Sequence, residues 1–127
     1  MQNRETYEYA VIRLVPKVER EEFLNVGVIL FSKRKKYLGI KYKIDKERIK
    51  AFAEDIDIEI VEKHLKAWEM VCQGAPQGGT IGQFELPSRF RWLVASRSTI
   101  IQSSKTHPGL CNDPEAVLSK LFKRYVL

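Results

Sequence analysis

The stretch TYEYAVIRLV, residues 6–15, decides the fold class of this chain because its side chains alternate between two faces. One face holds Tyr7, Tyr9, Val11, Arg13 and Val15, and the other holds Ala10, Ile12 and Leu14. A period of two, with aromatic and β-branched residues, is typical of a β-strand. Pro16 follows directly, and a proline cannot donate to a sheet ladder. The stretch therefore predicts a strand that ends at Val15.

Two more strands are expected close behind the first. They are NVGVILFS, residues 25–32, and YLGIKYK, residues 37–43, joined by a basic turn at 33–36. Neighbouring antiparallel strands need only short connections, whereas parallel strands need a long crossover. We therefore expect an antiparallel meander of three strands.

The hydrophobic period then changes to that of helices. Asp45 and Asp57 are candidate N-caps of two helices, and Gly74 is expected to end the second. Asp113 and Pro114 are typical of the start of a final helix. The apolar stripes are Ile58, Val61, Leu65, Trp68 and Cys72 in the second helix, and Val117, Leu118, Leu121, Phe122 and Tyr125 in the last.

Two segments before the final helix complete the prediction. Residues 89–95 fit either a helix or a strand, and we expect a short helix; residues 98–104 are expected to form a strand. His107–Gly109 reads as a turn. Strands grouped at the start indicate an α+β fold. The expected architecture is an antiparallel sheet of about four strands, a three-stranded N-terminal meander plus one later strand, packed against three to four helices.

Length and composition fit an ordinary globular protein. The chain has 127 residues, of which 44% are hydrophobic and 30% are charged, so we expect one domain over 1–127. No apolar run approaches the ~20 residues of a transmembrane helix, so no contact with a membrane is expected. No signal-peptide pattern opens the sequence, so we expect a cytoplasmic protein with Cys72 and Cys111 reduced.

The net charge of +6 is spread unevenly. Residues 33–50 hold nine Lys or Arg against two acids, whereas residues 51–85 hold two against seven. A basic block makes nucleic acid a candidate partner. Lysines are also typical of solvated edge strands, and we favour that interpretation.

The common catalytic and cofactor motifs are absent from the sequence. No cofactor is therefore expected. The two histidines are His64, on an amphipathic helical face where a packed role is favoured, and His107. Together with Cys111 they have no metal-site spacing, so no metal is expected either.

A first polar cluster surrounds Arg13, on a strand that otherwise looks buried. An arginine is costly to bury unless an acidic group pairs with it. If the first two strands form a hairpin, Glu22 or Asn25 could reach Arg13, with Asn25 and Gly27 fixing a bend or bulge. We favour this structural role. The alternative is that Arg13, with Arg20, forms one wall of an anion site.

A second polar cluster lies in residues 86–112, which contain no carboxylate. The candidate anion-binding residues here are Arg97, Ser98, Thr99, Lys105 and His107, and Gln102 is expected to be a structural polar residue. Guanidinium, hydroxyl and backbone N–H groups could surround a phosphate or carboxylate, and His107 could act as a general acid. Alternatively, the hydroxyls satisfy turn backbones and Arg97 pairs with an acid in 54–62.

These clusters lie in two motifs, YAVIRLVPKVEREEFLNVGVILF at 9–31 and FRWLVASRSTIIQSSKTHPGLCNDPEAVLSKLFKRYV at 90–126. In both, the chain resembles the bacterial domain-of-unknown-function family 3037 (DUF3037). The matching positions are Arg13, Pro16, Arg20, Glu22, Phe23, Asn25, Gly27, Arg97, Ser98, Thr99, Gln102, His107 and Gly109. The resemblance implies no assigned catalytic residue. It implies a HipA-like kinase as a partner, since family genes often neighbour genes for such kinases.

Three functional hypotheses follow from the sequence. We favour a non-enzymatic binding or accessory protein with an anion-binding surface, partnering the HipA-like kinase that the resemblance implies. The second hypothesis is a phosphate-ester or nucleotide-processing enzyme that uses His107 and the arginines. The third is a nucleic-acid binder that uses the basic block at 33–50.

Overall fold

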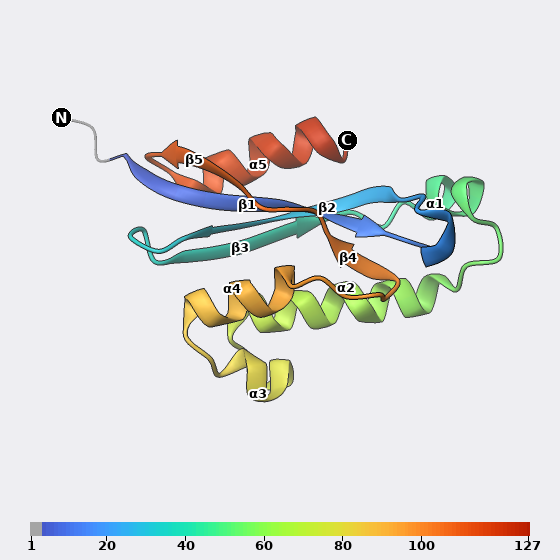
Figure 1. Cartoon of the computed structure of the whole chain (residues 1–127), viewed down its shortest axis with the longest axis horizontal. Helices are drawn as coiled ribbons and strands as arrows, with labels where there is room; N and C mark the ends of the chain where they lie inside the picture. The colour runs from blue at the N-terminus through green and yellow to red at the C-terminus, as the bar shows by residue number, and fades with distance from the viewer. Residues whose placement is uncertain (1–3) are drawn as a thin grey trace.

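An antiparallel sheet with helices on both faces forms this protein (Figure 1), in a computed structural model that describes residues 4–127. The strands are β1 (Glu5–Leu14), β2 (Leu24–Ser32), β3 (Tyr37–Tyr42), β4 (Ile101–Ser103) and β5 (His107–Cys111). The helices are α1 (Lys46–Phe52), α2 (Ile58–Gln73), α3 (Gly79–Gly82), α4 (Leu86–Val94) and α5 (Pro114–Tyr125), with 3-10 turns at Val18–Arg20 and Pro76–Gly78. The predicted α+β class is confirmed, with five strands rather than about four.

The sheet is built around β1. The predicted meander is confirmed, because β1 pairs with β2 and β2 pairs with β3, both antiparallel. The other edge of β1 is shared by two short strands. β5 pairs with Glu5–Tyr9 of β1, and β4 pairs with Ile12–Leu14.

The prediction of a turn at His107–Gly109 was wrong, since these residues begin β5. A proline-glycine pair is a strong local turn signal, but here it lies in an outer strand, where a missing N–H is tolerated. Gly109 stands opposite Tyr7, and the Tyr7 ring occupies the place that a Cβ atom at position 109 would take. The long-range pairing with β1 therefore outweighs the local turn preference.

The two faces of β1 enter different cores, as the alternation predicted. Ala10, Ile12 and Leu14 are fully buried in the core against α2 and α4. On the opposite face, Val28 and Leu30 of β2 pack in a second core with Leu118 and Leu121 of α5. Figure 1 shows α5 on one side of the sheet and α2 with α4 on the other.

The helix ends follow the expected capping chemistry. The Asp45 carboxylate accepts from the Arg48 N–H at 3.1 Å, and the Asp57 carboxylate accepts from the Glu59 N–H at 3.0 Å. Gly74 ends α2 with a φ of 67°, in the left-handed region that favours glycine. The helix expected at 89–95 is confirmed as part of α4. None of the helices in residues 4–127 could span a lipid bilayer.

Candidate functional site

A β-bulge in β2 places Asn25 beside Arg13. Ile12 pairs with Gly27 but Arg13 pairs with Asn25, so Val26 is an extra residue in β2. Without this extra residue, Asn25 would lie on the opposite face of the sheet. Gly27 is required next to the bulge, because a Cβ atom there would stand 2.7 Å from the backbone oxygen of Lys41. The bulge predicted at Asn25 and Gly27 is therefore present.

A hollow of about 250 Å³, which we call the Arg13 pocket, lies on the α5 side of the sheet. Its lining residues are Tyr9, Val11, Arg13, Phe23, Asn25, Ser104, His107 and Tyr125. They come from β1, β2, β5, α5 and the segments beside these elements. None of the lining residues is an Asp or a Glu, so the pocket has a positive side chain and no negative one.

Arg13 has an aromatic neighbour but no acidic one. The central carbon of its guanidinium lies 4.0 Å from the centre of the Phe23 ring. Its Nε is buried and has no hydrogen-bond partner, and no carboxylate of residues 4–127 forms an ion pair with it. Glu22, which the sequence suggested as a partner of Arg13, pairs with Arg20 at the exposed surface instead. The charge of Arg13 is therefore unmatched.

Asn25 lies directly across the strand pair from Arg13. Its Nδ2 donates to the backbone oxygen of Tyr125 at 3.2 Å, which fixes the orientation of the amide. Its Oδ1 is buried and accepts no hydrogen bond. Arg13 and Asn25, which both line the Arg13 pocket, thus carry one buried donor and one buried acceptor that remain unsatisfied, and buried polar groups are normally paired; Asn25 also lines a neighbouring pocket beside Arg48.

Tyr9 and Tyr125 close the pocket beside α5. Their hydroxyl oxygens lie 3.1 Å apart, and either one can donate. Burial, together with this hydrogen bond, raises the pKa of Tyr9 to about 12. The bond uses one of the two phenolic hydrogens, and the other has no acceptor among the contacts of residues 4–127. The pair can therefore donate one O–H hydrogen to a bound group.

His107 lines the pocket without a catalytic partner. Its ring lies 5.3 Å from that of Tyr9, centre to centre, and its side chain is exposed. The neighbouring Ser104 hydroxyl already accepts from the Val11 N–H at 2.8 Å and donates to the Lys105 backbone oxygen at 2.9 Å. Within the described part of the chain, His107 contacts neither Ser98 nor a carboxylate.

The structure separates Arg97 and Thr99 from His107. Both line a second hollow of about 300 Å³, the Trp92 pocket, between α2, α3 and α4 on the other side of the sheet. The Arg97 guanidinium stacks at 4.4 Å on the Trp92 ring and donates to the Trp92 backbone oxygen. No acid from 54–62 pairs with it. The residues predicted to form one anion-binding surface are thus divided between two pockets.

A comparison with known protein families gives a match that includes the residues of both pockets. A family model described as "Protein of unknown function (DUF3037)" matches residues 9–126. The chain belongs to the DUF3037 family. The resemblance seen in the two sequence motifs is confirmed, and the DUF3037 description assigns no activity. A search of curated proteins and a search of solved structures found no match.

The other candidate residues of this DUF3037 protein lie outside the Arg13 pocket. Arg20 and Glu22 form their ion pair at the rim of a surface hollow near α1. Ser98 and Lys105 are exposed. Gln102 faces Arg13 across β1 and β4 and donates to the Thr99 backbone oxygen at 2.8 Å.

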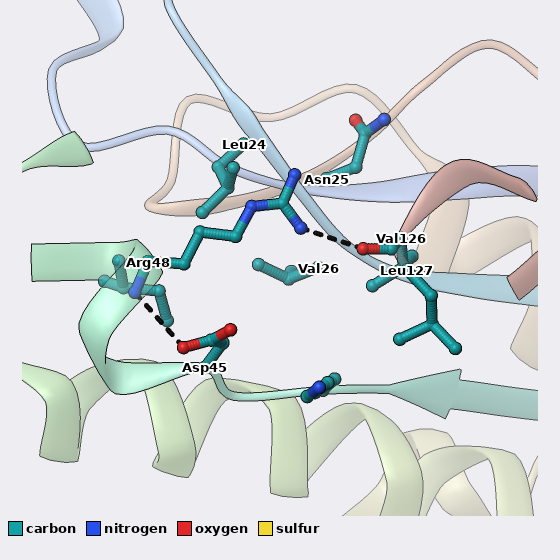
Figure 2. A pocket seen from close by; sticks show the side chains of 9 residues that line it. Leu24, Asn25, Val26, Asp45, Arg48, Val126 and Leu127 are labelled. Atoms are coloured by element: carbon teal, nitrogen blue, oxygen red, sulfur yellow. Dashed lines mark hydrogen bonds between the residues drawn. The ribbon is translucent and has the colours of Figure 1, made fainter. Parts of the chain in front are cut away.

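A third hollow, the Arg48 pocket of about 210 Å³, adjoins the end of α5 (Figure 2). Arg48 reaches across it from α1 and donates to the Val126 backbone oxygen at 2.8 Å. The Asp45 carboxylate also lines this pocket. Because its arginine has an acceptor and an acid stands nearby, the Arg48 pocket fits an anion less well than the Arg13 pocket does.

Metal binding has no support in the described residues. In residues 4–127, no three His, Cys, Asp or Glu side chains come together as a metal site. Both cysteines are buried and free, and burial raises the pKa of the Cys72 thiol to about 12.

Sequence reasoning missed Tyr9 and Tyr125 as parts of the site. The alternation of β1 does place Tyr9 on the face of Arg13, and that signal could have been used. Tyr125 is separated from Tyr9 by 116 positions, and only the packing of α5 brings it there.

Proposed function

We propose that this protein binds a small anion, a carboxylate or a phosphate, in the Arg13 pocket. One observation carries the proposal: Arg13 has a buried Nε without a hydrogen-bond partner, in a pocket that no acidic residue lines. Arg13 is half-buried, and a buried donor such as its Nε is costly to leave without a partner; a bound anion removes that cost.

The position of Phe23 suits this role. Stacking on an aromatic ring uses the face of a guanidinium and leaves its N–H groups free in the plane, where carboxylates and phosphates bind. The spare phenolic O–H of the Tyr9–Tyr125 pair adds a second donor. Val11 supplies an apolar wall for the rest of the ligand. The pocket of about 250 Å³ is suited to a ligand of a few heavy atoms.

A nuclear magnetic resonance titration at constant ionic strength tests the proposal, with sodium phosphate and sodium acetate as separate probes. We expect saturable shifts of the Arg13 Nε–H and of the backbone amides of Asn25 and His107. Arg13→Gln removes the charge but keeps a long side chain against Phe23, so it abolishes the shifts. Arg20→Gln is the matched control, because Arg20 is exposed and lies outside the pocket.

Two results would overturn the proposal. One is the absence of saturable shifts with either anion in a folded protein. The other is unchanged binding by the folded Arg13→Gln variant. If that variant does not fold, Arg13→Lys replaces it, because a lysine keeps the positive charge but cannot form the bidentate hydrogen bonds with which a guanidinium binds an anion. It should then bind several-fold more weakly than the wild type.

We also propose an accessory role beside a HipA-like kinase, which rests on the family resemblance alone. The test is co-purification of the two proteins after joint expression, with the Arg13→Gln variant alongside the wild type. A stable complex with the wild-type protein supports the partnership, and its absence counts against it. Loss of the complex in the variant would place the Arg13 pocket at the interface.

A further inference from the structure

We infer that the anion held in the Arg13 pocket carries a hydroxyl beside its negative group, as a small α-hydroxy acid does. The inference rests on the proposed function and adds to it a second observation. The buried Asn25 Oδ1 is an acceptor without a donor, and it lies across the strand pair from Arg13. A simple carboxylate would satisfy Arg13 and leave Asn25 unsatisfied.

The two unsatisfied groups do not bond to one another. The Asn25 amide is held by its Nδ2 bond to the Tyr125 backbone oxygen, and the Arg13 guanidinium is held over Phe23. Each group is thus fixed in place by a different neighbour. A ligand that presents an acceptor to Arg13 and a donor to Asn25 satisfies both at once, and its two functional groups must be close together because Arg13 and Asn25 are paired across the two strands.

The chemistry of the pocket favours a hydroxyl as that donor. An ammonium group, as in an amino acid, would stand close to the positive Arg13, and no acidic side chain lines the pocket to balance it. A phosphate monoester has its second pKa near ~6, and a neighbouring guanidinium lowers it further, so at neutral pH no O–H remains to donate. An aliphatic hydroxyl is neutral and keeps its hydrogen. An α-hydroxy carboxylate therefore fits both groups.

The test compares ligands that differ by one hydroxyl. Binding of glycolate, acetate and methoxyacetate is measured at neutral pH by the titration described above. Methoxyacetate keeps the oxygen of glycolate but has no hydrogen to donate. We expect glycolate to bind about three- to tenfold more tightly than either of the others, the gain expected for one net hydrogen bond.

A variant assigns that gain to Asn25. Asn25→Leu has a similar size and no acceptor, so it should bind glycolate and acetate equally. The matched control is Gln73→Leu, an amide change at the exposed end of α2, and it should keep the wild-type preference. If Asn25→Leu does not fold, the comparison of glycolate with methoxyacetate in the wild-type protein decides alone.

The outcomes separate this inference from the proposed function. Equal binding of glycolate and acetate means that water satisfies Asn25, which overturns the inference and leaves anion binding intact. Tighter binding of methyl phosphate than of glycolate also overturns it, in favour of a phosphate ligand. If none of these anions binds, the proposed function itself fails.

Discussion

The hydrogen bond between Tyr9 and Tyr125 should be measurable as a coupling between two conservative substitutions. Tyr9→Phe and Tyr125→Phe each remove one hydroxyl and keep both rings, whose centres lie 6.0 Å apart. The contact between the two tilted rings is then almost unchanged in every variant. Any interaction free energy between the two substitutions therefore reports the hydrogen bond itself.

The structure sets the size of the effect. The bond is 3.1 Å long and partly buried, and a bond of this kind contributes about 1 kcal/mol net. Each single variant loses it, and the double variant loses it once rather than twice. We expect about 1 kcal/mol of destabilisation in all three variants, and hence a coupling free energy of about 1 kcal/mol.

Urea unfolding followed by tryptophan fluorescence gives the free energy of unfolding of each variant. The matched control combines Tyr125→Phe with Tyr42→Phe, because the Tyr42 hydroxyl donates to Glu69 at 2.9 Å, on the opposite side of the sheet from α5. That pair should be additive. In Tyr125→Phe, the pKa of Tyr9 should fall from about 12 toward its ordinary value without reaching it, since burial is the larger cause of the shift.

An additive double variant would refute this reasoning. If the effects of Tyr9→Phe and Tyr125→Phe simply sum to within ~0.3 kcal/mol, the two hydroxyls do not bond in solution. The Tyr9–Tyr125 pair would then offer no oriented O–H group to the Arg13 pocket, although the packing of α5 on the sheet would remain.

Three further predictions concern stability. Asp113→Ala removes a carboxylate that accepts from two backbone N–H groups of α5, so urea unfolding should show a loss of about 1 kcal/mol, and Asp113→Asn should lose less. Phe90→Ala empties a fully buried site that stacks on Phe31, and should cost about 3–5 kcal/mol by the same measurement. Burial raises the pKa of Tyr37 and of Tyr42 from 10.0 to about 12, so the folded state holds these two protons more tightly than the unfolded state does. The urea concentration at the unfolding midpoint should therefore decrease as the pH rises from about 10 to about 12. The decrease should be smaller in a variant in which Tyr37 and Tyr42 are both replaced by phenylalanine.

The sequence was a good guide wherever local chemistry sets the structure. The period of two in 6–15 assigned each side chain of β1 to its face, and Asp45, Asp57 and Asp113 cap helices as predicted. The helical choice for 89–95 was also correct. In each case the structure is determined by interactions between residues that are close together in the sequence.

Prediction failed where distant segments decide the outcome. Pro108 and Gly109 carry a turn signal, but pairing with β1 makes them a strand. Arg97 and His107 are close in the sequence, yet β4 lies between them and the chain passes to the other side of the sheet. The stacking of Arg13 on Phe23 had no periodic signal at all. The sequence thus singled out Arg13, Asn25 and His107 of the candidate site. It did not single out Tyr9 and Tyr125.

The division of the outer edge of β1 between β4 and β5 has a consequence for how the chain folds during synthesis. The meander and its helices can form early, but that edge of β1 has no partner until residues 101–111 have left the ribosome. During this interval its unpaired N–H and C=O groups are open to pairing with other chains. The bond from the Val11 N–H to Ser104 spans 93 positions, and contacts of such range form slowly. A nascent chain therefore carries Arg13 long before it has a pocket to hold it.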